Sequence, residues 1–199
     1  MIKILTVCTG NICRSPYAEL FLQNELNRIS PESFTIRSAG SHALVGHPMD
    51  ERSSMKLHDL GVASDGFVAR QLNEDTAIGN DLILALTDKH RQNIVAMSPR
   101  LLKRTYTVRE FAAVLDQLAA MPDVSLPRGN DTTTVETRWA ALLKAAQLAR
   151  HTARTNLDGK LDVVDPYRQS DPVYDRMVDE LLPALRSIIE FESLHATAK

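Results

Sequence analysis

The chain has 199 residues, of which 44% are hydrophobic and 24% charged, as is typical of a globular protein with one substantial core. A formal net charge of -2 gives no electrostatic reason to expect a nucleic acid or an anionic membrane as partner. With two cysteines, no apolar run long enough to span a bilayer and no signal-peptide pattern, we expect a cytoplasmic protein with a single domain over residues 1–199.

The first predicted elements are a strand, a tight loop and a helix start. An apolar run over residues 2–7 ends on Cys8, residues 9–11 read as a loop, and Ser15 and Pro16 suit a first helical turn. Backbone N–H groups of such a loop converge on one point, where the helix dipole adds positive charge. Arg14 can close over that point with a planar guanidinium. The stretch therefore predicts an oxyanion-binding site.

Cys8 lies where this field favours a thiolate over a thiol, although the ordinary pKa of cysteine is about 8.5. It is then a candidate nucleophile for a bound phosphate. One alternative is a small buried core residue, which is the commoner role of free cysteine. Another is a metal or redox pair with Cys13, but four residues separate the two cysteines and no second pair exists. The adjacent Gly10, Asn11 and Arg14 favour the nucleophile.

The segment VCTGNICRSPYAE resembles the active-site signature of the low-molecular-weight protein tyrosine phosphatase family, in its bacterial form. The resemblance implies a hydrolase of aryl phosphate monoesters that acts through a phosphocysteine intermediate and needs no metal or other cofactor. Cys8 would attack phosphorus while Arg14 and the loop N–H groups hold the phosphoryl oxygens. Ser15 would donate to the thiolate and Asn11 would brace the loop. The loop residues expected around the substrate are Thr9, Gly10, Asn11, Ile12, Cys13 and Ser15.

The following elements alternate between helices and strands. The patterns predict helices over 17–29, 50–60 and 88–96, and further strands over 34–36, 81–86 and 105–108. The run 81–86 is nearly all apolar, as expected of a central parallel strand that is covered on both faces. We therefore predict an α/β fold with a four-stranded parallel sheet and helices on both faces, which resembles the low-molecular-weight phosphatase fold (phosphotyrosine protein phosphatase I).

Leu44 defines a second expected wall of the site. The segment GSHALVG is similar to bacterial members of the family that are associated with exopolysaccharide tyrosine kinases, whereas eukaryotic members carry an aromatic residue at the position of Leu44. The resemblance thus suggests an autophosphorylated bacterial tyrosine kinase as the phosphotyrosine protein substrate. Arg70, in an ARQL run, is expected to be an exposed structural residue rather than a phosphate ligand.

Between residues 110 and 160 the family pattern fades. A helix begins near Phe111, residues 122–134 are polar and turn-rich, and residues 135–146 form an amphipathic helix that contains Trp139. We interpret residues 117–160 as a family-atypical helical insertion on the same domain. It could cap the cleft or bind a partner, but a stabilising helix with Trp139 in the core is favoured. The six histidines lack metal-ligand spacing and are expected at the surface or in caps.

The segment VVDPYRQSDPVYDRM supplies the general acid that the mechanism needs. A carboxylic acid must protonate the leaving phenolate, and the resulting carboxylate must then activate water. Asp165, Pro166 and Tyr167 match the DPY motif that the resembled family carries near its C-terminus. We assign Asp165 as the acid and Tyr167 as another wall of the substrate slot. Asp171 is a rival, but it lacks the following aromatic residue and suits the cap of a last helix over 173–191.

The sequence leaves three alternative functions to consider. A thioredoxin-coupled arsenate reductase on this fold needs relay cysteines after the third strand, and residues 80–100 contain none. A non-catalytic phosphotyrosine-binding module would not need Cys8, Arg14 and Asp165 together. An interaction protein that acts through the insertion stays open. Cys13 has two interpretations of equal standing, as a partner of Cys8 in a reversible disulfide under oxidation and as a buried residue under the loop.

Overall fold

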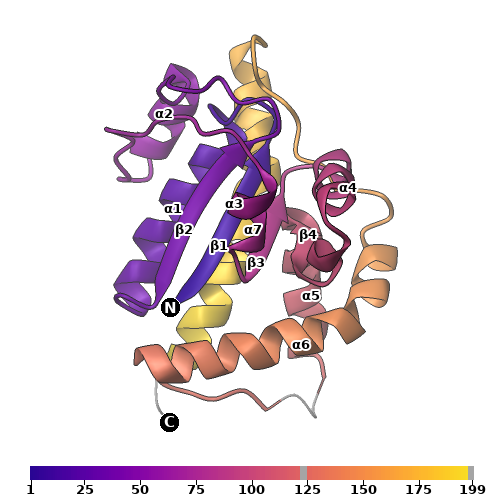
Figure 1. Ribbon diagram of the computed structural model, residues 1–199. Helices are drawn as coiled ribbons and strands as arrows, with labels where there is room; N and C mark the ends of the chain where they lie inside the picture. Colours follow the sequence, from indigo (N-terminus) through magenta and orange to yellow (C-terminus); the bar gives the residue numbers. More distant parts are fainter. Residues whose placement is uncertain (122–124, 197–199) are drawn as a thin grey trace.

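The computed structural model describes residues 1–121 and 125–196, and it has a four-stranded parallel sheet at its centre (Figure 1). The strand order is β2-β1-β3-β4. The strands are β1 (Ile2–Cys8), β2 (Phe34–Gly40), β3 (Leu82–Ala85) and β4 (Thr105–Thr107). In the register, Val7 of β1 faces Ala39 of β2 and Ala85 of β3, so the three strands end at one edge. The predicted fold class is confirmed.

Helices cover both faces of the sheet, as predicted. One face packs against α1 (Arg14–Ile29), α5 (Val108–Ala119) and α7 (Asp171–Ala196), with α2 (Glu51–His58) beside α1 and α7. The other face carries α3 (Glu74–Ile78), α4 (Asp88–Met97) and the 3₁₀ helix η1 (Pro99–Arg104). Side chains cap three of these helices: Asp50 accepts from N–H groups of α2, Asn73 from α3 and Thr87 from α4. The short helix α3 was not predicted.

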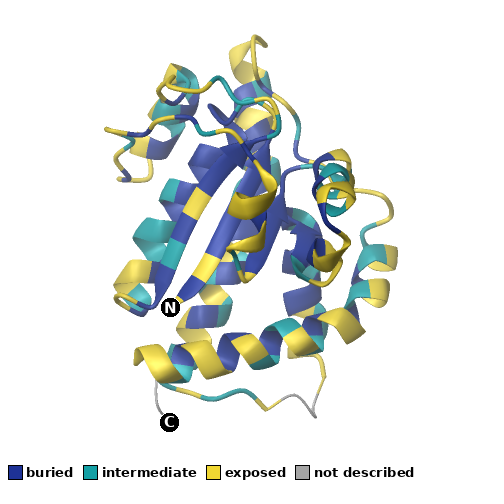
Figure 2. Cartoon of the chain, viewed as in Figure 1, coloured by how far each residue is buried: buried dark blue, intermediate teal, exposed yellow. Residues whose placement is uncertain are grey.

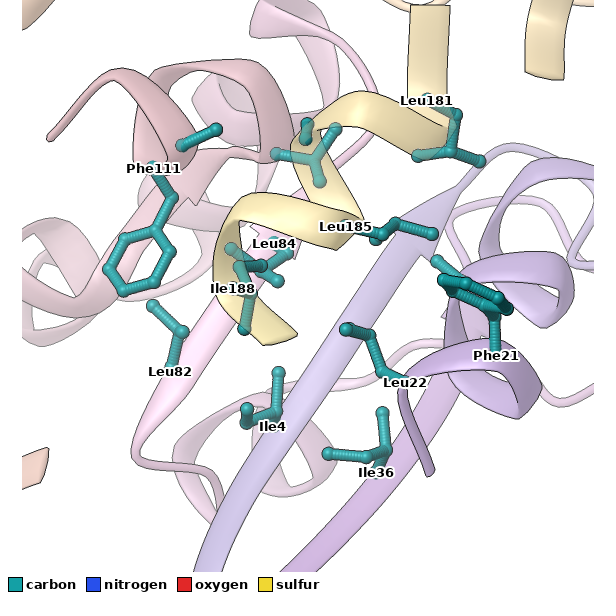
Figure 3. Close-up of a cluster of buried hydrophobic side chains, with 14 of the residues drawn as sticks. Ile4, Phe21, Leu22, Ile36, Leu82, Leu84, Phe111, Leu181, Leu185 and Ile188 are labelled. Carbon is teal, nitrogen blue, oxygen red and sulfur yellow. The ribbon is translucent and has the colours of Figure 1, made fainter. Parts of the chain in front are cut away.

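Alternating side chains of the strands divide the core into two halves. Ile4, Ile36 and Leu84 point to the face where Leu22 of α1 and Leu185 of α7 pack against them (Figure 3). On the opposite face, a second cluster contains Leu5, Val7, Ile83, Ala85, Ile94 and Leu101. Figure 2 shows the strands mostly buried: β3 and β4 are buried along their whole length, and the exposed strand residues are Lys3 in β1 and Arg37 in β2. This double coverage explains the continuous apolar run of β3.

The helix α6 (Thr132–Asn156) crosses the end of the sheet near the N-terminus, away from the end that carries Cys8 (Figure 1). Trp139 is fully buried and packs edge-to-face on Phe34, at the start of β2, with ring centroids 5.3 Å apart. The predicted helix over 135–146 extends to Asn156, because its alanine-rich sequence continues to bury small residues such as Ala149 and Ala153. Of the predicted turn-rich segment, residues 122–124 lie outside the described residues.

A buried carboxylate anchors α6 to α7. Glu192 of α7 accepts hydrogen bonds from the indole Nε1 of Trp139 at 2.9 Å and from the hydroxyl of Ser30 at 2.7 Å, and it forms an ion pair with the fully buried Arg138. The hydrogen bonds and the ion pair together offset the free-energy cost of burying the charge of Glu192. No helix among residues 1–121 and 125–196 combines the length and apolar character needed to cross a membrane.

Candidate active site

A cavity of about 120 Å³ opens at the edge of the sheet where β1 ends. All predicted site residues line it except Asn11 and Ser15, and His42 lines it in addition. The lining residues are Cys8, Thr9, Gly10, Ile12, Cys13, Arg14, His42, Leu44, Asp165 and Tyr167. The fold thus brings the N-terminal loop together with Asp165 and Tyr167 from the segment before α7.

The sulfur of Cys8 lies between donors at the bottom of this cavity. Its Sγ is 2.9 Å from the hydroxyl oxygen of Ser15 and accepts the backbone N–H of Asn11 at 3.3 Å. Both contacts stabilise the negative charge of a thiolate. As far as the structure describes the chain, the N-cap residue of α1, Cys13, makes no side-chain cap bond, which leaves the first-turn N–H groups to a ligand. This arrangement suits a nucleophile aimed at an oxyanion.

Asn11 braces the loop from behind, as the sequence suggested. Its backbone φ is +54°, a left-handed conformation that asparagine tolerates better than most residues. Its side-chain amide donates to the hydroxyls of Ser15 at 2.9 Å and Ser38 at 2.7 Å. Its carbonyl oxygen accepts the backbone N–H of Arg70 at 2.7 Å. Asn11 therefore joins the loop to β2 and to the segment before α3.

Glu19 completes this support and was not found from the sequence. Its buried carboxylate accepts the hydroxyl of Ser38 at 2.5 Å and pairs with Arg70 Nη2 at 2.5 Å. Arg70 is 39% exposed, pairs with Glu19 and does not line the cavity, which agrees with the predicted structural role. The sequence signal for Glu19 was a charged residue next to the apolar helical positions Ala18 and Leu22.

Gly40 lets the segment after β2 approach the loop closely. A Cβ at this position would lie 2.4 Å from the carbonyl oxygen of Thr9, a backbone atom that cannot move aside. Two hydrogen bonds follow from the close approach: His42 N–H to the carbonyl of Thr9 at 3.0 Å and Leu44 N–H to that of Gly10 at 3.0 Å. These bonds place Leu44 on the wall of the cavity, where it was predicted.

Arg14 and Asp165 form an ion pair across the cavity. The distance from Arg14 Nη2 to Asp165 Oδ2 is 2.7 Å, and Arg14 Nη1 donates to the carbonyl of Val163 at 3.2 Å. The buried Nε of Arg14 has no hydrogen-bond partner among the described residues, and an oxyanion in the loop would satisfy it. The rival Asp171 lies outside the cavity and pairs with Arg52 at 3.3 Å.

Cys13 is buried beneath the loop, and both cysteines are free. Burial raises the pKa of Cys13 to about 12, and the nearby Asp50 carboxylate contributes to the rise. Cys13 is therefore a neutral thiol at physiological pH. Its burial agrees with the structural interpretation of this residue, whereas a disulfide with Cys8 stays a prediction.

His90 was expected at the surface or in a cap, and it lies in the capped first turn of α4, where its backbone N–H donates to the Thr87 hydroxyl. It follows the cap residue Thr87, but its imidazole is buried beside the loop. Its Nε2 lies 2.9 Å from the hydroxyl oxygen of Thr9, and its Nδ1 lies 2.9 Å from that of Thr87. Burial lowers the pKa of His90 to about 4, assisted by the positive charge of Arg14. His90 thus holds the loop in place as a neutral ring.

The buried His90 makes stability depend on pH in a testable way. The unfolded chain takes up a proton as the pH falls through 6.5, whereas the folded state resists it until about 4. The contribution of His90 to the free energy of unfolding should therefore fall by about 2 kcal/mol as the pH is lowered from about 7.5 to about 5. Urea unfolding should show that His90→Gln loses less stability than the wild type over this interval. An equal loss in both proteins would contradict the assignment.

Within the described ranges, no group of three or more His, Cys, Asp and Glu side chains is arranged to hold a metal ion. His42 is the remaining lining residue that the sequence analysis did not select. It is exposed at the cavity mouth, and its Nδ1 lies 3.2 Å from the hydroxyl of Ser41. The sequence feature that could have identified His42 as a site residue is its position two residues before Leu44, in the same loop.

Comparison with known proteins gives a consistent result. A family model described as low molecular weight phosphotyrosine protein phosphatase matches residues 3–152. The low molecular weight protein-tyrosine-phosphatase Etp of Escherichia coli is 38% identical over 103 residues, which are 52% of this chain and 66% of Etp, slightly less than two thirds of that relative. A protein-arginine-phosphatase of Geobacillus stearothermophilus is 31% identical over 120 residues, covering 60% of this chain and 78% of the relative.

A solved structure resembles the whole chain. The tyrosine phosphatase Wzb from Escherichia coli K30, in complex with sulphate, superposes with a TM-score of 0.63 at 25% identity and covers 96% of this chain and 98% of Wzb. The family-model match ends at residue 152, before Asp165 and Tyr167. These two residues are therefore placed in the site by the geometry of this structure.

Proposed function

Because this chain belongs to the low molecular weight phosphotyrosine protein phosphatase family, we propose that it hydrolyses phosphotyrosine in proteins through a phosphocysteine intermediate. One observation carries the proposal: a single cavity contains the sulfur of Cys8, the guanidinium of Arg14 and the carboxylate of Asp165. A nucleophile, an anion-binding group and an acid are the three groups that the reaction needs.

In the first step the Cys8 thiolate attacks phosphorus. An S–P bond forms, the bond between phosphorus and the aryl oxygen breaks, and Asp165 gives its proton to the departing phenolate. The phosphoryl oxygens bind the N–H groups of the loop and the guanidinium of Arg14, whose buried Nε has no other partner within the described part of the chain. Charge that moves onto these oxygens is stabilised without rearrangement of the loop, because Asn11 already fixes its backbone.

In the second step a water molecule attacks the phosphocysteine. The carboxylate of Asp165 takes a proton from that water, the S–P bond breaks, and inorganic phosphate leaves. The electron pair returns to the sulfur of Cys8, where Ser15 and the N–H of Asn11 stabilise the thiolate. The same two contacts therefore assist the sulfur as nucleophile and as leaving group.

The walls of the cavity support an aryl substrate. Ile12, Leu44 and Tyr167 are apolar or aromatic and can enclose a phenyl ring. The protein-arginine-phosphatase relative makes phosphoarginine a second candidate. A guanidinium group would need a carboxylate of its own, and among the described residues the only carboxylate that lines the cavity, Asp165, is paired with Arg14. Phosphotyrosine therefore fits the cavity better.

Matched peptides that carry phosphotyrosine, phosphoserine or phosphoarginine at one position test this proposal. We expect the purified wild type to release phosphate fastest from phosphotyrosine, with kcat/KM at least about tenfold above phosphoarginine, since an unpaired buried charge is strongly disfavoured. Sulphate should compete with the substrate, because the loop is a general oxyanion site. Release from phosphoarginine alone would replace the proposed substrate, and no release from any peptide would reject the enzymatic function.

The sequence resemblance supports proposals on the cellular compartment of the enzyme and on its protein substrate. We infer a cytoplasmic enzyme of bacterial type whose substrate is an autophosphorylated tyrosine kinase. We also infer one domain over residues 1–199, with residues 117–160 as an insertion. The sharing of one core by α5, α6 and α7 favours a stabilising role for that insertion. The chain's two cysteines are both in the loop, which leaves none for the relay of an arsenate reductase.

A further inference from the structure

The acid loop, residues 160–170, joins α6 to α7 and carries Asp165. Figure 1 shows this segment, in orange, running from α6 past α4 to the start of α7. The side chain of Asp165 is 51% exposed. Among the described residues, its polar contacts are the ion pair with Arg14 and the backbone N–H of Tyr167, which donates to Oδ1 at 3.2 Å. With so little packing around the side chain, the position of the carboxylate depends on the backbone that carries it.

Two carboxylates hold that backbone just before Asp165. Asp162 Oδ1 accepts the backbone N–H of Asp88, the first residue of α4, at 2.7 Å. Glu180 of α7 accepts the backbone N–H of Val164 at 2.7 Å through Oε2. The other oxygen of Glu180 pairs with Arg176 at 2.7 Å, which orients the carboxylate toward the loop.

The residue between these two anchors is also fixed. Val163 donates its N–H to the carbonyl of Leu86, just after β3, at 2.9 Å, and its own carbonyl accepts Arg14 Nη1 at 3.2 Å. Three consecutive residues are thus tied to α4, to the end of the central strand and to α7. Two of these hydrogen bonds are accepted by side-chain carboxylates, so a side-chain substitution can remove them.

We propose that Asp162 and Glu180 are positioning residues for the general acid, an inference that rests on the proposed function. They act through the backbone of Asp165 and do not line the Cys8 cavity. A displacement of about 1 Å in a proton donor is enough to lower a rate by about 100-fold. Loss of either carboxylate should therefore impair proton transfer to the leaving group and leave the nucleophile and the oxyanion site intact.

A series of aryl phosphates separates this role from a general structural one. The parameter to compare is kcat/KM, which reports the steps up to departure of the phenol. For Glu180→Ala and Asp162→Ala we expect about a 10- to 100-fold loss with phenyl phosphate, which needs a proton on its leaving group. The loss should be under about threefold with 2,4-dinitrophenyl phosphate, whose leaving group departs without one.

Matched variants serve as controls. Glu190→Ala removes an exposed glutamate from the same helix and should behave as the wild type. Asp162→Asn keeps an oxygen that can accept the N–H of Asp88 and should recover most of the activity lost in Asp162→Ala. Thermal unfolding of each variant shows whether it is folded. Rescue by asparagine together with a leaving-group-dependent loss supports the proposal.

An equal loss for every leaving group, or no loss in either alanine variant, overturns the positioning role while the phosphatase function stands. If Glu180→Ala is unfolded, Glu180→Gln takes its place in the same series of aryl phosphates, because the amide keeps an oxygen that can accept the N–H of Val164. Activity of Glu180→Gln that falls equally with all substrates also counts against the proposal. A wild type that is inactive on every aryl phosphate rejects the proposed function itself.

Discussion

Cys8→Ser should lower kcat for phosphotyrosine hydrolysis by at least about 10⁴-fold, because loss of a catalytic nucleophile commonly has an effect of this size. The serine hydroxyl is far less acidic than the thiol, so the contacts with Ser15 and with the N–H of Asn11 would meet a neutral oxygen. Phosphate release measured with a phosphotyrosine peptide gives the rate. Acid-quenched enzyme should contain a phosphorus–sulfur adduct in the wild type and none in Cys8→Ser.

Cys13→Ser is the matched control, since it changes the other cysteine of the same loop. The pKa of about 12 keeps the Cys13 thiol protonated, so it cannot replace Cys8 as nucleophile. We expect Cys13→Ser to retain activity within about tenfold of the wild type, with the loss arising from altered packing. Undiminished turnover by Cys8→Ser, or an adduct that maps to Cys13, would contradict the assigned nucleophile.

The parts of the site that were predictable from sequence are those encoded by neighbouring residues. The order of strand, loop and helix around Cys8 follows from hydrophobic patterning and from the turn residues Gly10 and Asn11. The positive φ of Asn11 agrees with the conformational preference of asparagine. Asp165 was separated from Asp171 by its motif, and the structure places Asp165 alone of the two in the cavity.

The supporting residues could not be predicted in the same way, because their partners are distant in sequence. Thr9 and His90 are 81 residues apart, and Glu19 and Arg70 are 51 apart. Each pair forms only when the parallel sheet brings the carboxyl ends of its strands to one edge. The polarity of His90 or Glu19 alone does not show whether such a residue faces solvent or a buried partner.

The same limit applies to the fold. The strands and their central apolar run were predictable, because side chains on a strand alternate between two covered faces. The full extent of α6 was not, since a helix end depends on what its last turns contact. Glu192, the residue that anchors α6 through Arg138, lies on the last helix, 54 residues away in the chain. No local pattern links these two residues.

Asp165→Asn should lower the rate of phosphate ester hydrolysis and strengthen the binding of an anion. Asparagine has the shape of the aspartic acid but cannot supply its proton, so kcat/KM for phenyl phosphate should fall by about 10²- to 10⁴-fold. The loss should be much smaller for 2,4-dinitrophenyl phosphate, whose leaving group needs little protonation. Asp171→Asn is the matched control, and we expect it to change neither value, since Asp171 pairs with Arg52 outside the cavity.

The ion pair between Arg14 and Asp165 predicts the second effect. In the unliganded site the carboxylate occupies Arg14 Nη2 at 2.7 Å, so an incoming oxyanion must displace it and approach its negative charge. Neutral asparagine removes this competition, and inorganic phosphate should bind Asp165→Asn several-fold more tightly than the wild type. Titration calorimetry measures the difference directly. Weaker phosphate binding in Asp165→Asn would mean that the carboxylate preorganises Arg14 for the anion instead of competing with it.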